Sequence, residues 1–138
     1  MATELSNMKQ SELNRAKFAY DCVNSVLSKS QKTKESYKSY VKKIPTYIQV
    51  NGLAGALAFI FSKKGEGSPT KEAYKEIYKQ IDDWLKQNLK KNNDEDLVKW
   101  VIEQESKLYK AITIEVLSLF SWIRRFAEGK IEGEENNE

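Results

Sequence analysis

Residues 48–64, IQVNGLAGALAFIFSKK, form the least polar stretch of a lysine-rich chain. A membrane-spanning helix needs about 20 apolar residues. The run 50–61 is shorter, is interrupted by Asn51 and is followed closely by two lysines, so its length argues against a membrane segment. A helix that is apolar on every side is usually buried on every side. We therefore expect a helix at 52–62 that crosses the centre of a helical bundle or turns one side toward another chain.

Composition favours a single helical domain. The chain has 138 residues, 31% of them charged, with only two prolines and six glycines. This length is typical of one domain with its own core, and the composition favours helices over a turn-rich sheet. The single Cys22 cannot form an internal disulfide, and the first residues lack the apolar core of a signal peptide. A reduced, cytoplasmic location is expected.

Apolar residues recur at helical spacing along most of the chain. The expected fold is all-α, a single-domain bundle of about five to six helices. Helices are expected at about 7–28, 52–62, 69–90 and 106–128. A further helix is expected from residue 37, with a short helical piece at 45–50, and another carries the apolar residues 97, 98, 101 and 102. A break is expected near residue 105, with one continuous bent helix as the alternative. Gly129 is a typical stop signal. We expect the helical domain to cover 1–129 and residues 130–138, which are acidic and glycine-spaced, to form a disordered tail.

Several short signals set the expected helix boundaries. Residues 28–35, SKSQKTKE, lack apolar anchors and are expected to form a connector. Pro45 cannot donate a backbone hydrogen bond, so a kink or restart is expected there. Asn51 is a good N-cap and Gly52 permits unusual dihedrals, so a new helix can begin at this pair. Ser68, followed by proline, is a typical helix start.

Basic residues are concentrated in the first half of the chain. Residues 1–69 hold 11 basic and 5 acidic side chains, net +6, whereas residues 70–138 hold 12 basic and 15 acidic, net −3. The excess is densest at Lys29, Lys32, Lys34, Lys38, Lys42 and Lys43. Such a cluster is either a solvated helix face or a surface that contacts phosphates.

No pattern of catalytic residues emerges. The chain has no histidine, which removes the commonest general base and all histidine-ligated metal sites. Cys22 falls in an apolar stripe and is expected to be a core residue. The acidic clusters 82–83 and 94–96 consist of helix neighbours that do not face each other. We predict a non-enzyme without cofactor or metal, and keep an enzyme using Asp82 or Asp94 as a minor hypothesis.

Arg124 and Arg125 lie near the end of the last predicted helix. One interpretation is structural, because cations stabilise a helix C-terminus and arginine stems cover apolar neighbours. The other is recognition of phosphate or carboxylate by the guanidinium fork. The sequence leaves both open.

Two segments carry a family resemblance. YVKKIPTYIQVNGLAGALAFIFSKK and TIEVLSLFSWIRRFAEG together resemble the small helical subunit of the type III-B CRISPR effector complex, the Cmr or RAMP module. The segment RAKFAYDCV, residues 15–23, looks like the family's first helix. The matching positions are Val41, Lys42, Lys43, Pro45, Asn51, Gly52, Leu53, Leu57, Ala58 and Phe59, then Tyr109, Thr113, Glu115, Leu117, Trp122, Arg124, Arg125, Phe126 and Ala127.

The resemblance implies a non-catalytic, all-helical subunit that stacks in a few copies beside the subunits holding the guide RNA and helps to bind target RNA. The implied partners are the other complex subunits, guide RNA and target RNA, with self-association possible and no membrane. From their positive charge and their positions in the segments that resemble the family, six residues are predicted to contact phosphates: Arg15, Lys17, Lys42, Lys43, Arg124 and Arg125. A helical DNA-binding regulator is the alternative, although the turn at residues 51–52 leads into an apolar helix with nothing to recognise bases.

Overall fold

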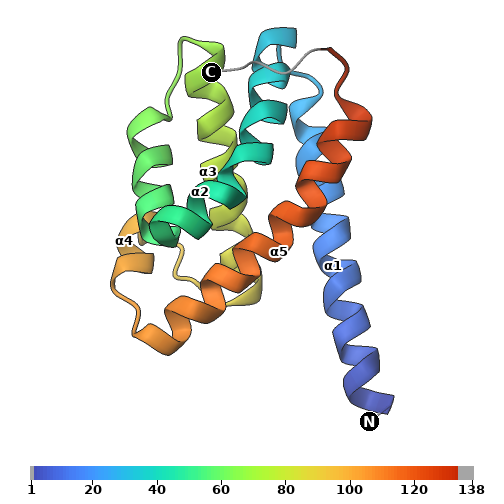
Figure 1. The fold of residues 1–138 in the computed structure, drawn as a ribbon, viewed down its shortest axis with the longest axis vertical. Coiled ribbons are helices and arrows are strands. Elements are labelled where there is room, and N and C mark those ends of the chain that lie inside the picture. Colours follow the sequence, from blue (N-terminus) through green and yellow to red (C-terminus); the bar gives the residue numbers. More distant parts are fainter. Residues whose placement is uncertain (1, 134–138) are drawn as a thin grey trace.

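The computed structural model describes residues 2–133, with side chains from residue 8 onward. It contains the helices α1 (Ala2–Val26), α2 (Gln31–Lys63), α3 (Pro69–Asn88), α4 (Leu97–Ile102) and α5 (Ser106–Lys130) (Figure 1). No strand occurs among these residues. The prediction of a single all-α domain is confirmed, as is the break near residue 105, where the Glu105 carboxylate caps α5 by accepting from the Leu108 amide.

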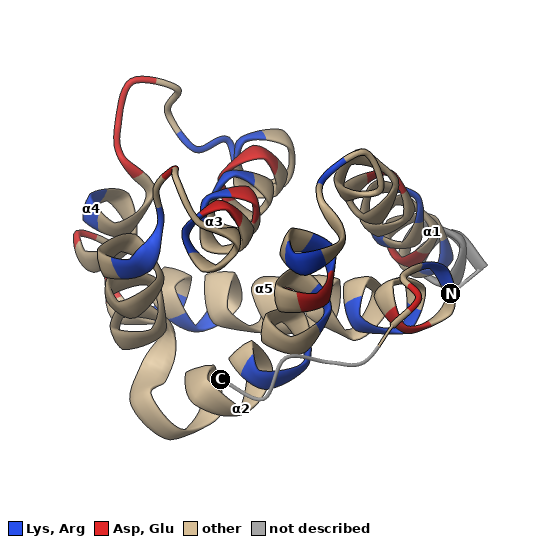
Figure 2. Cartoon of the chain, turned by 90° about the horizontal axis from the view of Figure 1, so that it is seen from above, with Lys and Arg blue, Asp and Glu red and all other residues tan. Residues whose placement is uncertain are grey.

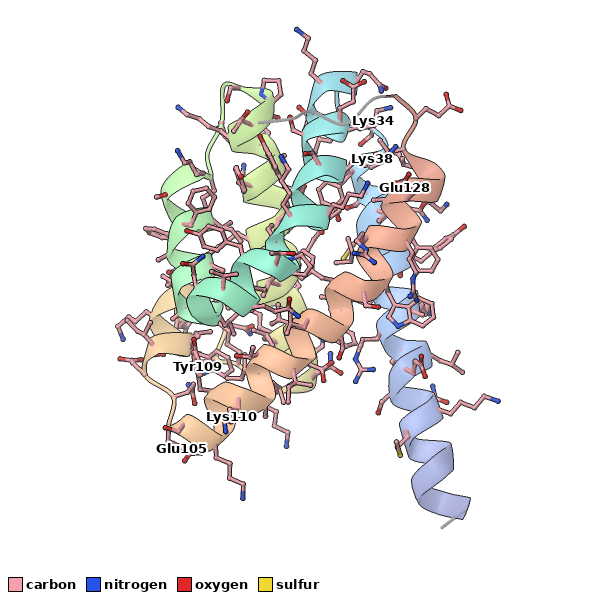
Figure 3. All side chains as sticks on the ribbon, viewed as in Figure 1. Lys34, Lys38, Glu105, Tyr109, Lys110 and Glu128 are labelled. Carbon is pink, nitrogen blue, oxygen red and sulfur yellow. The ribbon has the colours of Figure 1, made fainter. Side chains whose placement is uncertain are left out.

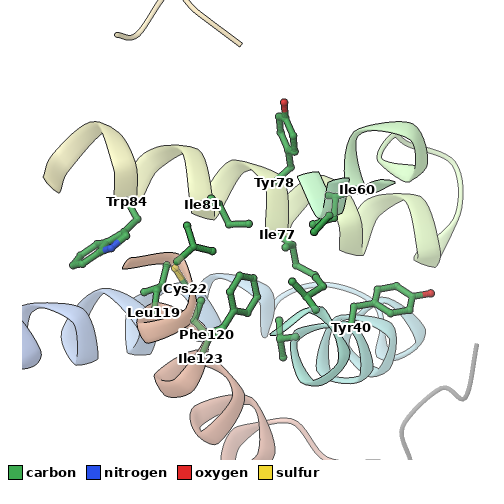
Figure 4. Close-up of a cluster of buried hydrophobic side chains, with 14 of the residues drawn as sticks. Cys22, Tyr40, Ile60, Ile77, Tyr78, Ile81, Trp84, Leu119, Phe120 and Ile123 are labelled. Carbon is green, nitrogen blue, oxygen red and sulfur yellow. The ribbon is translucent and has the colours of Figure 1, made fainter. Parts of the chain in front are cut away.

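The core lies where α2, α3 and α5 meet. α2 packs mainly against α3 and α5, while α1 packs against α5. The apolar residues that recur at helical spacing in α3 are buried, and Ile77, Ile81 and Leu85 are almost inaccessible. Phe120 and Ile123 of α5 reach the same cluster, together with Cys22 of α1 (Figure 4). Burial of these apolar side chains is the main stabilising contribution to the fold.

α2 consists of two arms joined at Gly52. This residue has φ 81° and ψ 159°, and it is the one position inside α2 with non-helical dihedrals. The second arm turns sharply back from the first (Figure 1). The predicted role of Gly52 is thus confirmed. The predicted restart at Pro45 is wrong, because the helix keeps helical dihedrals through this residue.

The predicted connector 28–35 is also wrong in its second half. α2 begins at Gln31, and the Ser30 hydroxyl caps it by accepting from the Thr33 amide at 3.2 Å. Long-range contacts replace the missing apolar anchors. The Gln31 side chain donates to the carbonyl of Glu132 at 2.7 Å, and Lys38 donates to that of Ile131 at 3.0 Å. The start of α2 is therefore stabilised by residues 93 and 101 positions away in the sequence.

The second arm of α2 is buried on one side only. Leu53, Leu57 and Ile60 are inaccessible, whereas Phe61 is 47% exposed. Of the two expected alternatives, burial on every side is wrong, while an exposed side that meets another chain stays a prediction. Taken as one helix of 33 residues, α2 is long and apolar enough to cross a membrane by length and composition alone, but the non-helical Gly52 divides it into two arms. A core helix meets the same criteria, and the buried face of α2 is packed on the bundle.

Both ends of the chain differ from the expectation. The described part of α1 starts at Ala2 rather than near residue 7 and extends beyond the bundle (Figure 1). α5 continues past Gly129 to Lys130, and Ile131 is buried. The predicted domain boundary at 129 stays a prediction, since residues 134–138 of the tail lie outside the described residues.

Candidate nucleic-acid interface

α2 and α5 bring three of the six predicted phosphate contacts, Lys42, Lys43 and Arg124, into one region. The ammonium of Lys42 on α2 lies 3.8 Å from the Glu128 carboxylate on α5. Arg124, one helical turn before Glu128, lines a shallow hollow with Pro45 and Gln49 of α2. Lys42 and Arg124 therefore border the same seam between the two helices.

Lys43 lies next to this seam, and Arg125 follows Arg124 on α5. Lys43 lines an open hollow on the first arm of α2 together with Lys42, Tyr47 and Val50. Arg125 is exposed one position beyond Arg124, on the side of α5 away from the core. We name the surface formed by Lys42, Lys43, Arg124 and Arg125 the α2–α5 face.

The α2–α5 face carries an excess of positive charge. Within the described part of the chain, neither Arg124 nor Arg125 has an ion pair, while Lys42 is balanced by Glu128. Lys and Arg recur on α2 and α5, whereas both signs alternate along α3 (Figure 2). A polyanion is accordingly attracted to the α2–α5 face more than to α3.

Arg15 is held by other protein groups. Its Nε donates to the Glu115 carboxylate at 2.9 Å, and the Trp84 indole donates to the same oxygen at 3.0 Å. The side chains of Arg15 and Glu115 are each only 21% exposed. This cluster joins α1, α3 and α5 on the side of α5 that faces α1, so Arg15 is separate from the α2–α5 face. Lys17 is exposed on α1.

The lysine cluster of the first half does not form one surface. Lys38 is buried and donates to the Ile131 carbonyl, and Lys29 lies 3.7 Å from the Glu76 carboxylate on α3. Lys34 and Lys38 lie where the start of α2 meets the end of α5, near Glu128 (Figure 3). In this lysine cluster, Lys29 and Lys38 thus make contacts within the protein, whereas Lys42 and Lys43 belong to the α2–α5 face.

Two groups considered for catalysis, Cys22 and Asp82, lie in structural surroundings. Burial raises the pKa of the Cys22 thiol, with nearby carboxylates adding to the effect, so the nucleophilic thiolate is suppressed. The Asp82 carboxylate lies 2.9 Å from the ammonium of Lys86 and 2.8 Å from that of Lys91. Among the described residues, no group of three or more His, Cys, Asp or Glu side chains could hold a metal ion.

The helix after the turn at residues 51–52 does not resemble a recognition helix. Its large residues Leu53, Leu57 and Ile60 are used in the core. Gly55, Ala58 and Phe61 are exposed along it and have no side-chain donor or acceptor for base edges, and polar side chains are exposed only at its end, at Ser62 and Lys63. The geometry disfavours the DNA-binding alternative.

Comparisons with known proteins agree with the fold and with the two matched segments. The family model described as CRISPR-associated protein (Cas_Cmr5) matches residues 11–130. The chain belongs to the Cmr5 family. A crystal structure of a CRISPR-associated Cmr5 family protein from Thermus thermophilus is similar, with a TM-score of 0.69 and 28% sequence identity. The similarity covers 88% of this chain and 97% of that chain.

Membership of the Cmr5 family confirms the resemblance found in the sequence and makes the protein a CRISPR-associated subunit, consistent with a type III-B Cmr complex. The match includes α1 from residue 11 and ends at the last residue of α5. All six predicted contact residues fall inside the matched range. Their contacts with RNA stay predictions.

Proposed function

We propose that this protein is a non-catalytic, cytoplasmic subunit of a type III-B RNA-guided effector complex, and that its α2–α5 face contacts the phosphates of target RNA. The observation that carries the proposal is the convergence of Lys42 and Arg124 on one seam, although 82 positions separate them in the sequence. Basic side chains spaced along a groove neutralise successive phosphates and release counterions.

The α2–α5 face is the primary contact in this proposal. Lys43 and Arg125 widen it, and all four side chains are exposed. Arg15 and Lys17 form a second, weaker contact on α1, because Glu115 already neutralises part of the Arg15 charge. Phosphate contacts carry no sequence information, so target RNA is bound without sequence preference.

Other surfaces serve the assembly. The part of α1 that extends beyond the bundle exposes Met8 and Leu13 at 68% and 52%, which suits contact with a neighbouring subunit or with a further copy in a stack. Apolar side chains gathered on an extended helix are typical of protein interfaces. Cleavage of RNA then belongs to other subunits of the complex.

Affinity purification of the tagged full chain from its native cells, with and without ribonuclease, tests the proposal. We expect RAMP-type subunits and short guide RNAs to co-purify, and the subunits to remain after ribonuclease treatment. A variant with Lys42→Ala and Arg124→Ala should still assemble but should recover less target RNA. Recovery of the protein without RAMP-type subunits would contradict the proposed function.

A further inference from the structure

The two arms of α2 enclose a cleft that sequence periodicity does not indicate. Its volume is about 290 Å³. It is lined by Tyr40, Lys43, Ile44 and Tyr47 of the first arm, Ala56, Phe59 and Ile60 of the second, and Tyr74 of α3. We name this cavity the α2 cleft. It exists because the chain turns back at Gly52, so its walls come from both sides of one kink.

Four aromatic rings form the walls and hold one another in place. Tyr40 stacks on Tyr74 with ring centroids 4.2 Å apart and planes inclined by 7°. Phe59 meets Tyr74 edge-on at 5.8 Å and stacks with Tyr47 at 5.0 Å. Tyr40 is fixed further, since its hydroxyl donates to the Thr70 hydroxyl at 3.2 Å. Contacts within the protein therefore hold the walls in position.

The edge of the α2 cleft is basic. Lys43 is the one charged residue among the described residues that line it, and the Lys63 ammonium lies 5.7 Å from the centre of the Phe59 ring. Within the described part of the chain, no acidic side chain lines the cavity. Lys43 and Tyr47 also line the open hollow of the α2–α5 face, so the cleft is continuous with the proposed RNA-binding surface.

We infer that the α2 cleft receives one unstacked base of the bound RNA, while Lys43 neutralises the adjoining phosphate. This inference rests on the proposed function. Single-stranded nucleic acids bind to surfaces that combine basic groups with aromatic rings on which bases stack. The cavity is at the small end of ligand pockets, which fits a single base. An apolar side chain of another subunit would fill the same space but would gain nothing from a cationic edge.

Titration of the full chain at low salt with fluorescent oligouridylate, and with an abasic strand of equal length, tests this inference. The wild-type protein should bind the base-containing strand about tenfold more tightly than the abasic strand, from base stacking. Phe59→Leu, which keeps apolar bulk but removes one of the four rings of the walls, should lose most of this preference. Its salt dependence should stay that of the wild type, since no phosphate contact is removed.

Phe61→Leu is the matched control. Phe61 lies on the same arm and is 47% exposed, but it does not line the cleft, so its variant should keep the wild-type preference. A Phe59→Leu protein that retains the preference overturns the base site and leaves the proposed RNA contact intact. Failure of the wild type to bind either strand at low salt overturns both. If the Phe59→Leu protein keeps the wild-type preference for the base-containing strand but no longer co-purifies with the other subunits, the cleft binds a protein partner instead of a base.

Discussion

The hydroxyl of Tyr109 on α5 accepts a hydrogen bond from the backbone amide of Ala54 on α2 at 2.9 Å. The kink at Gly52 leaves the first backbone amides of the second arm without helical acceptors. The Tyr109 hydroxyl, 55 positions away in the sequence, accepts from the amide of Ala54. Tyr109 lies near the start of α5, next to Lys110 (Figure 3). This one side chain therefore links the kink of α2 to α5.

Removing the Tyr109 hydroxyl should destabilise the fold. In Tyr109→Phe the Ala54 amide loses its acceptor in a partly buried place, at a cost of about 1–2 kcal/mol in the free energy of unfolding. Urea denaturation followed by circular dichroism measures this. Tyr20→Phe is the control, because Tyr20 is 43% exposed, and its change should stay within about 0.5 kcal/mol. Equal stability of the two variants would contradict the capping role of Tyr109.

Gly52→Ala should destabilise the protein, whereas Gly55→Ala should not. At Gly52 the positive φ is unfavourable for alanine, and the added Cβ would lie 3.3 Å from the Tyr109 hydroxyl oxygen. The expected loss is about 1–3 kcal/mol. At Gly55, three residues along the same arm, the Cβ makes an ordinary 3.6 Å contact with the Asn51 Cβ. There alanine should stabilise the helix by about 0.5–1 kcal/mol, and thermal denaturation distinguishes the two outcomes.

Arg15→Ala should lower stability more than Lys17→Ala. Arg15 neutralises the largely buried Glu115 carboxylate, and its loss leaves that carboxylate with the Trp84 indole as its remaining donor in the cluster. We expect a cost of about 1 kcal/mol, measured as a shift in the urea midpoint. Lys17 is exposed on the same helix and should change stability by less than about 0.5 kcal/mol. Indistinguishable midpoints would show that the ion pair contributes nothing measurable.

Stability should fall in strongly alkaline solution. Burial, together with the neighbouring Tyr40 and Tyr47, raises the pKa of Tyr74 from 10.0 to about 12. A raised tyrosine pKa means that the folded state favours the protonated form. The resulting contribution of Tyr74 to the free energy of unfolding is complete below pH 10 and is lost as pH rises toward 12. The urea midpoint should decline over that window, and less steeply in Tyr74→Phe. An unchanged slope in the variant would show that Tyr74 does not take part.

Local signals in the sequence predicted the helices and the kink, but not the contacts that complete them. The positive φ of Gly52 was foreseeable from the Asn-Gly pair. The N-cap predicted at Asn51 was wrong, since its side chain donates back to the Tyr47 carbonyl at 3.4 Å. The acceptor that replaces it comes from α5, and no local pattern predicts a partner so distant in the chain.

The same limit applies to the candidate site. Charge and matched position nominated Lys42 and Arg124, and packing of α5 on α2 places them on one seam. Charge alone also included Lys38, which is buried because residues 131–133 cover it. The α2 cleft was not predicted, because each arm of α2 taken alone has the pattern of a core helix and the cavity arises only from their fold-back.

Binding of single-stranded RNA as a function of salt tests the α2–α5 face most directly. The logarithm of the association constant falls linearly with that of the salt concentration, by about 0.7 for each phosphate neutralised. The double variant Lys42→Ala, Arg124→Ala should therefore have a slope shallower than the wild type by about 1.4. The control is the double variant Lys75→Ala, Lys79→Ala on the exposed side of α3. It removes the same amount of positive charge and should leave the slope unchanged. Equal slopes for the wild type and the Lys42, Arg124 variant would contradict phosphate binding at this face.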